Sequence, residues 1–277
     1  MMSKIIQFDT VDKFAEHNKK FITDNIMANF LLMKSIDDIF DGKLKPLDGF
    51  NVTSKGGEII VLVTNGICML YGNYASDEIA LKITDRIRNS IPLKNVVFAG
   101  TKKLVDCIVK YNKITVQQLK HRIHYECKKV NPIQCSPGQM LPLNLENLDL
   151  YVEFGMKFNL SYDDGTTATA EIMSESLKSS IENKSISQWV NQNDICSICR
   201  AYVMYDYPVI DFFFTAEKHR GKGYGTSLVH SITSMRLEEG HNRCILTADG
   251  NNQTSNNVFQ KVGYKKTTEY LKVLTLE

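Results

Sequence analysis

The sequence has no long hydrophobic run. None of the apolar stretches in its 277 residues approaches the ~20 residues that a transmembrane helix needs. The first residues, MMSKIIQFDTVDKF, also lack the apolar core of a signal peptide. We therefore expect a cytoplasmic protein with no membrane partner.

The chain has almost no net charge. Lys and Arg number 33 against 31 Asp and Glu, which leaves a formal charge of +2. Domains that bind nucleic acid usually carry a strongly basic surface. Nucleic acid is therefore not an expected partner, and any site for an anion must be local.

The seven cysteines and six histidines show no convincing metal pattern. Cys196 and Cys199 form a CxxC pair in a predicted strand, but no second pair follows at zinc-ribbon spacing. His121, His124 and Cys127 are spaced by three, and on a helix the first and last would diverge by about 120°. We expect reduced thiols, no metal, and a solvated face for the cationic segment that holds these histidines.

Apolar patterns predict alternating strands and helices in the first half. Asn65-Gly66 lies between two β-branched apolar runs, which is typical of a β-hairpin. Ser76 stands before an apolar pattern of helical spacing and is suited to cap that helix. In order, the predicted elements are a helical opening segment, a hairpin at 58–72, a helix at 76–91, a strand at 96–100 and a helix at 102–111.

Three prolines and a glycine lie between Asn131 and Pro142 and disfavour both a helix and an interior strand. We expect a linker at 132–142, between an N-terminal α/β domain (1–131) and a C-terminal domain (143–277). Predicted in the second domain are helices at 144–158 and 168–183, three strands within 187–215 joined by NQND and YDYP turns, a helix from Gly225 to Gly240, a strand at 243–248, a short helix ended by Gly263, and a final strand. The fold class is α/β with a mixed sheet.

The segment HRGKGYG, residues 219–225, places three glycines at alternate positions between a predicted strand and a helix. The first N–H groups of a helix lack intrahelical partners, and its N-terminus carries partial positive charge. The glycines can take positive φ, while Arg220 and Lys222 add charge. These properties predict a phosphate or pyrophosphate cradle. Neither the P-loop pattern nor the GxGxxG dinucleotide pattern fits the spacing.

Two stretches resemble the GNAT (Gcn-five-related) N-acetyltransferases. FFFTAEKHRGKGYGTSLVHSI is similar to the loop that holds the acetyl-CoA pyrophosphate after the family's fourth strand. DGNNQTSNNVFQKVGY is similar to a late helix in a branch of predicted acetyltransferases. The resemblance covers residues 139–277 and implies a GNAT fold there. In that branch the N-terminal half is often a degenerate second GNAT-like unit, which would suit residues 1–130.

The resemblance also implies where the coenzyme would bind. Backbone amides from Arg220 to Thr226 would hold the pyrophosphate. The strand end from Phe213 to Thr215 would lie along the pantetheine, with a main-chain N–H polarising the thioester carbonyl. The implied coenzyme-binding residues are Phe213, Phe214, Thr215, Arg220, Gly221, Lys222, Gly223, Tyr224, Gly225, Thr226, Asn252, Asn256 and Phe259.

Two catalytic roles follow less directly from the resemblance. An amine with a pKa near ~10.4 must lose a proton to a base or to a water relay. Many relatives use a glutamate on the fourth strand as this base, and the matching position here is nearest Val209. Asp211 lies two residues later, which is the same face of a regular strand, and is the candidate base. Relatives protonate the leaving thiolate with a tyrosine, but that position is Phe259. Either Tyr264 or water substitutes, or the chemistry is impaired.

These observations predict an acyl-CoA-dependent N-acyltransferase that transfers acetyl from acetyl-CoA to an unidentified primary amine by direct attack. Two alternatives stay open. One is a coenzyme A-binding module without turnover, suggested by Phe259 and the missing glutamate. The other is a glycine N-acyltransferase-like enzyme, which shares a two-unit layout. The sequence identifies neither the acceptor nor the oligomeric state.

Overall fold

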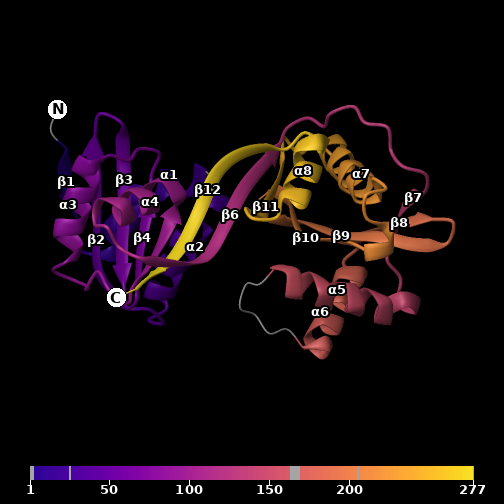
Figure 1. Ribbon diagram of the computed structural model, residues 1–277, viewed down its shortest axis with the longest axis horizontal. Coiled ribbons are helices and arrows are strands. Elements are labelled where there is room, and N and C mark those ends of the chain that lie inside the picture. The colour runs from indigo at the N-terminus through magenta and orange to yellow at the C-terminus, as the bar shows by residue number, and fades with distance from the viewer. Residues whose placement is uncertain (1–2, 25, 163–168, 205, 277) are drawn as a thin grey trace. The chain divides into compact units, whose positions relative to one another are not determined.

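The computed structural model describes residues 3–24, 26–162, 169–204 and 206–276. By its internal contacts the chain divides into two compact units (Figure 1). Unit 1 comprises Met1–His124 and Thr268–Glu277, and unit 2 comprises Tyr125–Thr267. The expected division lay between residues 131 and 143, with the last strand in the second domain. The difference arises because two long strands, β6 (Val116–Cys127) and β12 (Lys265–Thr275), each carry residues of both units.

Unit 1 has the strand order β1-β2-β3-β4-β5-β12. Its elements are β1 (Lys4–Gln7), α1 (Val11–Asp24), α2 (Ile26–Phe40), β2 (Pro46–Ser54), β3 (Gly57–Thr64), β4 (Ile67–Tyr71), α3 (Asp77–Ile87), β5 (Val97–Thr101) and α4 (Lys102–Tyr111). The predicted hairpin, helices and strand are confirmed, whereas β1 and β2 were not predicted. The Ser76 side chain accepts a hydrogen bond from the Ile79 N–H at 3.3 Å, as expected of an N-cap.

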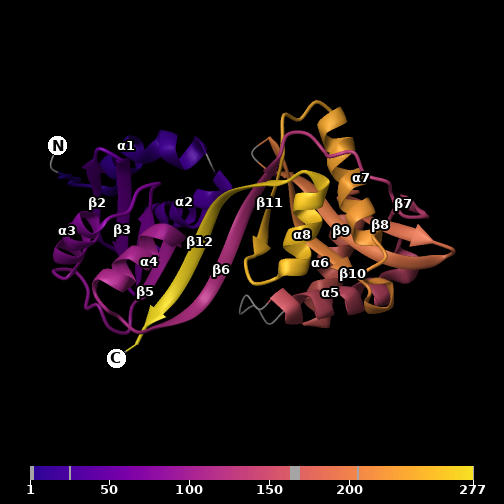
Figure 2. The same cartoon turned by 45° about the horizontal axis from the view of Figure 1, so that its top comes forward.

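The strands of unit 1 are buried on both faces, and alternate residues of β3 pack in opposite directions. Val61 and Val63 belong to a core with α3 and α4. Ile60 and Leu62 belong to a second core with α1 and α2. Figure 2 shows these helices around the strands of unit 1. The continuous apolar sequence of β3 therefore reflects burial on both faces.

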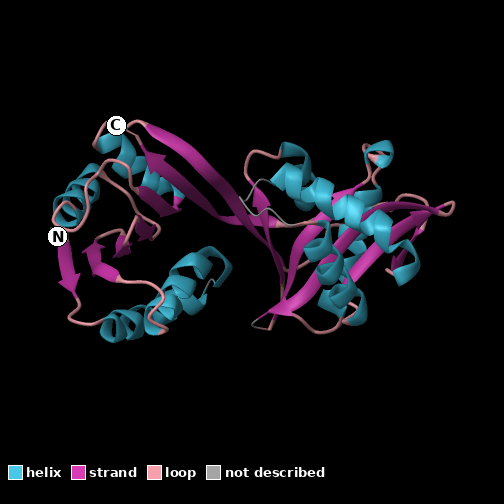
Figure 3. Ribbon diagram, turned by 90° about the horizontal axis from the view of Figure 1, so that it is seen from below, coloured by secondary structure: helices cyan, strands magenta, loops and turns pink. Residues whose placement is uncertain are grey.

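Unit 2 has the strand order β6-β11-β10-β9-β8-β7. Its elements are β7 (Gln139–Pro142), α5 (Leu148–Tyr162), α6 (Ala170–Glu182), β8 (Ile186–Asn191), β9 (Asp194–Met204), β10 (Tyr207–Thr215), α7 (Tyr224–Glu238), β11 (Cys244–Asp249) and α8 (Gln253–Val262). Helices α7 and α8 lie on one face of this sheet and α5 and α6 on the other (Figures 1 and 3). The predicted elements are confirmed within the described residues; the expected helix start at 168 and Tyr205 of the YDYP turn lie outside them.

Two sequence interpretations are corrected by the fold. The cationic segment around His121 is strand β6 and not a solvated face: Arg122 and His124 are each only 7% exposed. The helical geometry assumed for its histidines is therefore wrong. Within the expected linker, Gln139–Pro142 forms edge strand β7, where a proline is tolerated because one side of the strand makes no ladder hydrogen bonds.

The two units repeat one order of elements. Each begins with a strand and two helices, continues with three antiparallel strands, and then adds a helix, a strand parallel to the third, and another helix. In unit 1 the strand beside β5 is β12, and in unit 2 the strand beside β11 is β6. The α/β class with a mixed sheet is confirmed. Within the described part of the chain, no helix has the length and apolar character needed to cross a bilayer.

Candidate functional site

The parallel strands β10 and β11 of unit 2 separate soon after they pair. Val209 pairs with Ile245 and Ile210 with Leu246, and the described residues form no later pair between these strands. Strand β10 continues to Thr215 and β11 to Asp249. Within the described residues, the edge of β10 after Ile210 therefore has no strand partner on the β11 side, and its backbone groups can bind a ligand.

A β-bulge lies where the two strands part. In the ladder with β9, Ile210 pairs with Ala201 and Phe212 with Arg200, which leaves Asp211 as the extra residue. A bulge bends its strand and breaks the alternation of side chains. The bulge therefore decides which side chains of the following FFFT segment face each side of the sheet.

The glycine segment forms the N-terminus of α7. Gly221 and Gly223 have φ of +74° and +82°, and Gly223 is the N-cap residue. In the part of the chain that the structure describes, no N–H group from Gly221 to Thr226 donates a hydrogen bond to another protein group. Unpaired donors at a helix N-terminus can bind an anion, so this geometry is compatible with the cradle that the sequence predicts.

The third glycine serves packing. A Cβ atom on Gly225 would lie 2.5 Å from Thr215 Oγ1 and 2.7 Å from Phe213 Cζ, so the helix reaches the end of β10 only because this side chain is absent. A Cβ on Gly221 would meet nothing within 4 Å. The loop is therefore open on its outer side at Gly221 and closely packed at Gly225.

Part of the expected linker supports the loop. The Ser136 hydroxyl donates to the Lys222 carbonyl at 2.8 Å, and the Ser136 N–H donates to Ser227 Oγ at 2.8 Å. Trp189 Nε1 donates to the Pro137 carbonyl at 3.1 Å. These contacts use the loop's carbonyl side and leave its N–H groups unpaired. Sequence reasoning missed Ser136, because a serine in a proline-rich segment gives no signal of its partner.

The side chains of the loop have two roles. Arg220 and Lys222 are exposed; the Arg220 guanidinium donates from Nε to the Thr215 carbonyl at 3.2 Å and lies 5.6 Å from the centre of the Phe214 ring. The Tyr224 hydroxyl accepts from Asn191 Nδ2 at 3.0 Å. Arg220 and Lys222 can thus face a ligand, whereas Tyr224 ties the loop to β8.

Aromatic side chains line the separated strands on the α8 side. The Phe213 ring lies 5.8 Å from that of Phe259, which in turn lies 6.2 Å from the Tyr125 ring. Phe214 faces the other way and packs 5.2 Å from Phe154 of α5. Phe213 and Phe259 therefore belong to the candidate site, while Phe214 belongs to the core beneath it.

The two predicted asparagines lie at α8, Asn252 exposed at its N-cap and Asn256 buried. Asn252 Oδ1 caps α8 by accepting from the Ser255 N–H at 3.0 Å. Asn256 donates from Nδ2 to the carbonyls of Asp249 and Asn252, both at 2.9 Å, and its Oδ1 accepts from the Tyr125 hydroxyl at 3.0 Å. Both shape the rim formed by β11 and α8, and Asn256 has both of its amide protons bound inside the protein.

The candidate acid Tyr264 is buried behind Phe259, with the two ring centres 6.1 Å apart. Its side chain is 2% exposed, and its hydroxyl lies 2.9 Å from Thr233 Oγ1 of α7. Burial raises the pKa of Tyr264 well above its ordinary value, so the phenol gives up its proton less readily. The Tyr264 hydroxyl thus bonds to α7, on the far side of its ring contact with Phe259, and its role as the acid stays a prediction.

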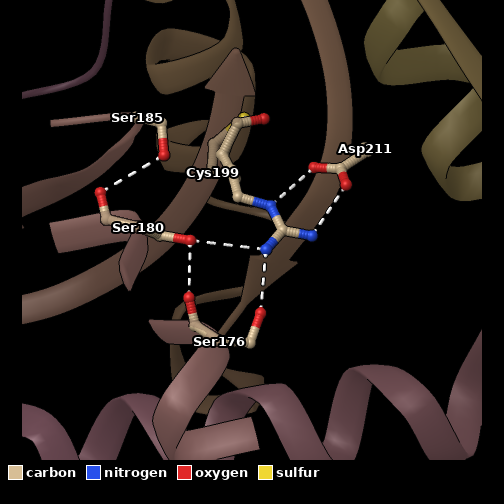
Figure 4. Close-up of polar contacts among 6 residues, drawn as sticks. Ser176, Ser180, Ser185, Cys199 and Asp211 are labelled. Carbon is tan, nitrogen blue, oxygen red and sulfur yellow. Dashed lines mark hydrogen bonds and ion pairs between the residues drawn. The ribbon is translucent and has the colours of Figure 1, made fainter. Parts of the chain in front are cut away.

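The candidate base Asp211 has a different partner from the one expected. Its carboxylate accepts from Arg200 Nε at 2.8 Å and from Nη2 at 2.7 Å (Figure 4). Asp211 thus lies on the α6 face of the sheet, the face that Arg200 shares with Tyr202, the strand partner of Val209. Arg200 could have been found by counting outward from the β9–β10 turn, which places it opposite this acid. Both side chains also line a pocket of about 650 Å³.

Unit 1 lacks the same site at the corresponding place. Strands β4 and β5 stay paired from Ile67–Val97 to Leu70–Gly100, and a Cβ on Gly100 would lie 1.9 Å from the Leu70 carbonyl oxygen. The following helix α3 is capped by Ser76 and has Asp77 and Glu78 in its first turn. Paired strands leave no gap, and carboxylates at a helix N-terminus repel an anion.

Comparisons with known proteins agree with this geometry. Residues 190–273 match the family described as FR47-like protein. No curated protein sequence matches the chain. Among solved structures, an acetyltransferase of the GNAT family from Colwellia psychrerythraea shares the fold with a TM-score of 0.56 at 14% identity, covering 99% of this chain and 100% of its own.

A second solved structure, the GCN5-related N-acetyltransferase from Sphaerobacter thermophilus, also has a TM-score of 0.56, at 11% identity, with 98% of this chain and 95% of that chain covered. At such identities the likeness concerns the fold. The family match spans β10, the glycine loop, β11 and α8, which are the elements that form the candidate site. The GNAT resemblance that the two motifs predicted is therefore confirmed, and the chain has the fold of the GNAT acetyltransferases.

Proposed function

We propose that the protein is an N-acetyltransferase and that unit 2 binds acetyl-CoA. One observation carries the proposal: at the end of β10, strands that separate from one another meet a helix N-terminus with unpaired N–H groups. A long acyl carrier with a pyrophosphate at one end needs both features together. The fold and the family match at residues 190–273 support it.

The residues present fit such a ligand. The amides from Gly221 to Thr226 would hold the pyrophosphate, with charge added by Arg220 and Lys222. The unpaired edge of β10 after Asp211 would bind the amide groups of the pantetheine arm as a neighbouring strand would. Acetyl-CoA would supply an acetyl group activated as a thioester. A main-chain N–H on this edge would stabilise negative charge on the acyl oxygen.

The acceptor would be a primary amine that attacks the thioester directly. Such an amine, with a pKa near ~10.4, must lose a proton first. Because Asp211 is held by two hydrogen bonds from Arg200, we assign this proton to water. The leaving thiol, with a pKa near ~8.5, can depart as a thiolate without an acid at Phe259. Turnover should therefore rise with pH through the neutral range.

A second candidate function is coenzyme A binding without turnover. It is favoured by Phe259, whose ring has no proton to donate, and by the ion pair that occupies Asp211. The two functions share the site and differ only in chemistry. A direct assay of thiol release separates them.

The test is to incubate the protein with acetyl-CoA and a panel of primary amines and to measure free thiol over time. We expect release that depends on the amine. Tight coenzyme binding with no release above hydrolysis would favour the second candidate. Release only from benzoyl-CoA with glycine would favour a glycine N-acyltransferase. Absence of coenzyme binding would contradict all three.

A further inference from the structure

The pair Arg200–Asp211 belongs to a network that joins β9, β10 and α6. Besides its two bonds to Asp211, Arg200 donates from Nη1 to Ser176 Oγ at 3.1 Å and to Ser180 Oγ at 3.4 Å (Figure 4). The Ser185 hydroxyl donates to the Ser180 carbonyl at 3.2 Å, which links the network to the start of β8. The geometry of the guanidinium is thus set from three directions.

The network lies at the bulge. Asp211 is the extra residue, and the last pair between β10 and β11 precedes it at Ile210. Beyond the bulge, Phe212 packs 4.7 Å from Phe158 of α5, whereas Phe213 packs 5.8 Å from Phe259 of α8. A slip of one residue would exchange these faces. The bulge therefore determines which backbone and side chains border the gap between the strands.

The pair is well placed to hold this bulge. A bidentate contact between guanidinium and carboxylate fixes both distance and orientation. The side chains are 27% and 30% exposed, so solvent screens the pair less than it screens the open pairs of the surface. Within the described residues β10 has no strand partner on its β11 side at this point, so its contacts with β9, the ion pair among them, restrain its direction.

We propose that Arg200 and Asp211 are positioning residues: they fix the bulge, and thereby the separation of β10 from β11 that receives the pantetheine arm of acetyl-CoA. This inference rests on the proposed function. Neither residue contacts the acyl group in this role. In this role Asp211 only accepts the two hydrogen bonds from Arg200.

The test compares Arg200→Met, Asp211→Asn and the double variant with the wild-type protein. Titration calorimetry gives the Kd for acetyl-CoA, and steady-state kinetics gives kcat and both KM values. We expect each single variant to raise Kd and KM for acetyl-CoA about tenfold, equivalent to ~1.4 kcal/mol. The double variant should be no worse than either single one, because all three remove the same contact. The KM for the amine and the pH profile of kcat/KM should not move.

Arg243→Met is the matched control. Arg243 donates to Glu126 at 3.1 Å and to the Tyr207 hydroxyl at 2.8 Å, and Tyr207 begins β10 at the end opposite the loop. The side chains of Arg243 and Glu126 are 26% and 24% exposed, much like those of Arg200 and Asp211. This variant should lower the thermal stability comparably and leave the Kd for acetyl-CoA unchanged. If Arg200→Met does not fold, Arg200→Lys keeps the charge without the fork and should give a smaller rise in Kd.

Each outcome decides the inference. Asp211→Asn with a normal Kd, a large loss of kcat and an altered pH profile would make Asp211 the general base and overturn the positioning role. Unchanged Kd in all variants would also overturn it. If the wild-type protein itself binds no acetyl-CoA, the proposed function fails and this inference with it. The wild-type titration thus separates the two failures.

Discussion

At the scale of single residues, the glycines at the two ends of α7 take similar backbone angles for different purposes. Gly223 has φ of +82° at the N-terminus and Gly240 has φ of +98° after the C-terminus. A Cβ on Gly223 would lie 2.5 Å from Ser136 Oγ, whereas a Cβ on Gly240 would meet nothing within 4 Å. Strain is common to both positions, but only one adjoins the loop with unpaired N–H groups.

We predict that Gly223→Ala and Gly240→Ala each lower the free energy of unfolding by about 1 kcal/mol, because alanine disfavours positive φ. Gly223→Ala should also weaken acetyl-CoA binding, since it displaces Ser136 and the loop. Chemical denaturation and titration calorimetry measure the two effects. Equal coenzyme affinity in both variants would mean that the loop is not the binding site.

His124 should make unit 1 sensitive to acid. Burial lowers the pKa of this side chain from 6.5 to about 4. Below pH 6.5 the unfolded chain takes up a proton that the folded chain does not, so the free energy of unfolding falls as the pH drops from 6.5 toward 4. The loss should approach about 3 kcal/mol at the lower end.

The check is denaturant unfolding from pH 8 to pH 4 for the wild-type protein and His124→Gln. The variant should show a shallower decline between pH 6.5 and 4, with a constant difference from the wild type above pH 7. An identical slope in the two proteins would show that His124 does not carry this dependence.

Single residues also show where sequence reasoning stops. The glycine cradle follows from local chemistry, since helix N-termini and positive φ need no tertiary information. The hydrogen-bond partners of Asp211 and Tyr264 could not be predicted, because they come from a neighbouring strand and from α7. Asn256 was predicted to lie near the coenzyme, but its side-chain amide donates to the carbonyls of Asp249 and Asn252.

At the scale of elements, local patterns predicted the hairpin of β3 and β4 and the helices α3 and α7, whose turn residues and caps are adjacent in sequence. Strand β6 was missed because its lysines and histidines resemble a surface segment. Its burial comes from strands distant in the chain, which composition does not reveal. The affiliation of β12 with unit 1 was unpredictable for the same reason.

Strand β12 gives a prediction at this scale. Strand β12 pairs antiparallel with β5, from Tyr270 opposite Thr101 to Leu274 opposite Val97. Its residues Leu271 and Val273 are buried in the core of unit 1. A chain that ends at Thr267 should therefore lose cooperative folding of unit 1, because β5 would keep an open edge and an exposed core. Hydrogen exchange should show rapid labelling of β4 and β5.

The matched control is Leu276→Ala, which changes an exposed residue next to the removed strand. It should leave the protection of β4 and β5 as in the wild type. Protection that survives the truncation would show that β12 is not needed to complete unit 1.

At the scale of the whole molecule, two units with the same order of elements differ at the place that matters for binding. In unit 2 the parallel strands separate beside a loop with unpaired N–H groups. In unit 1 they stay paired beside a helix with Asp77 and Glu78 in its first turn. The repeat of the fold thus does not imply a repeat of the site, and the chain should hold a single coenzyme.

Isothermal titration of the intact chain with acetyl-CoA tests the central claim most directly. The account predicts one binding site per chain, and weaker binding in Gly223→Ala with normal binding in Gly240→Ala. No binding, two sites per chain, or equal affinity in the two variants would contradict it.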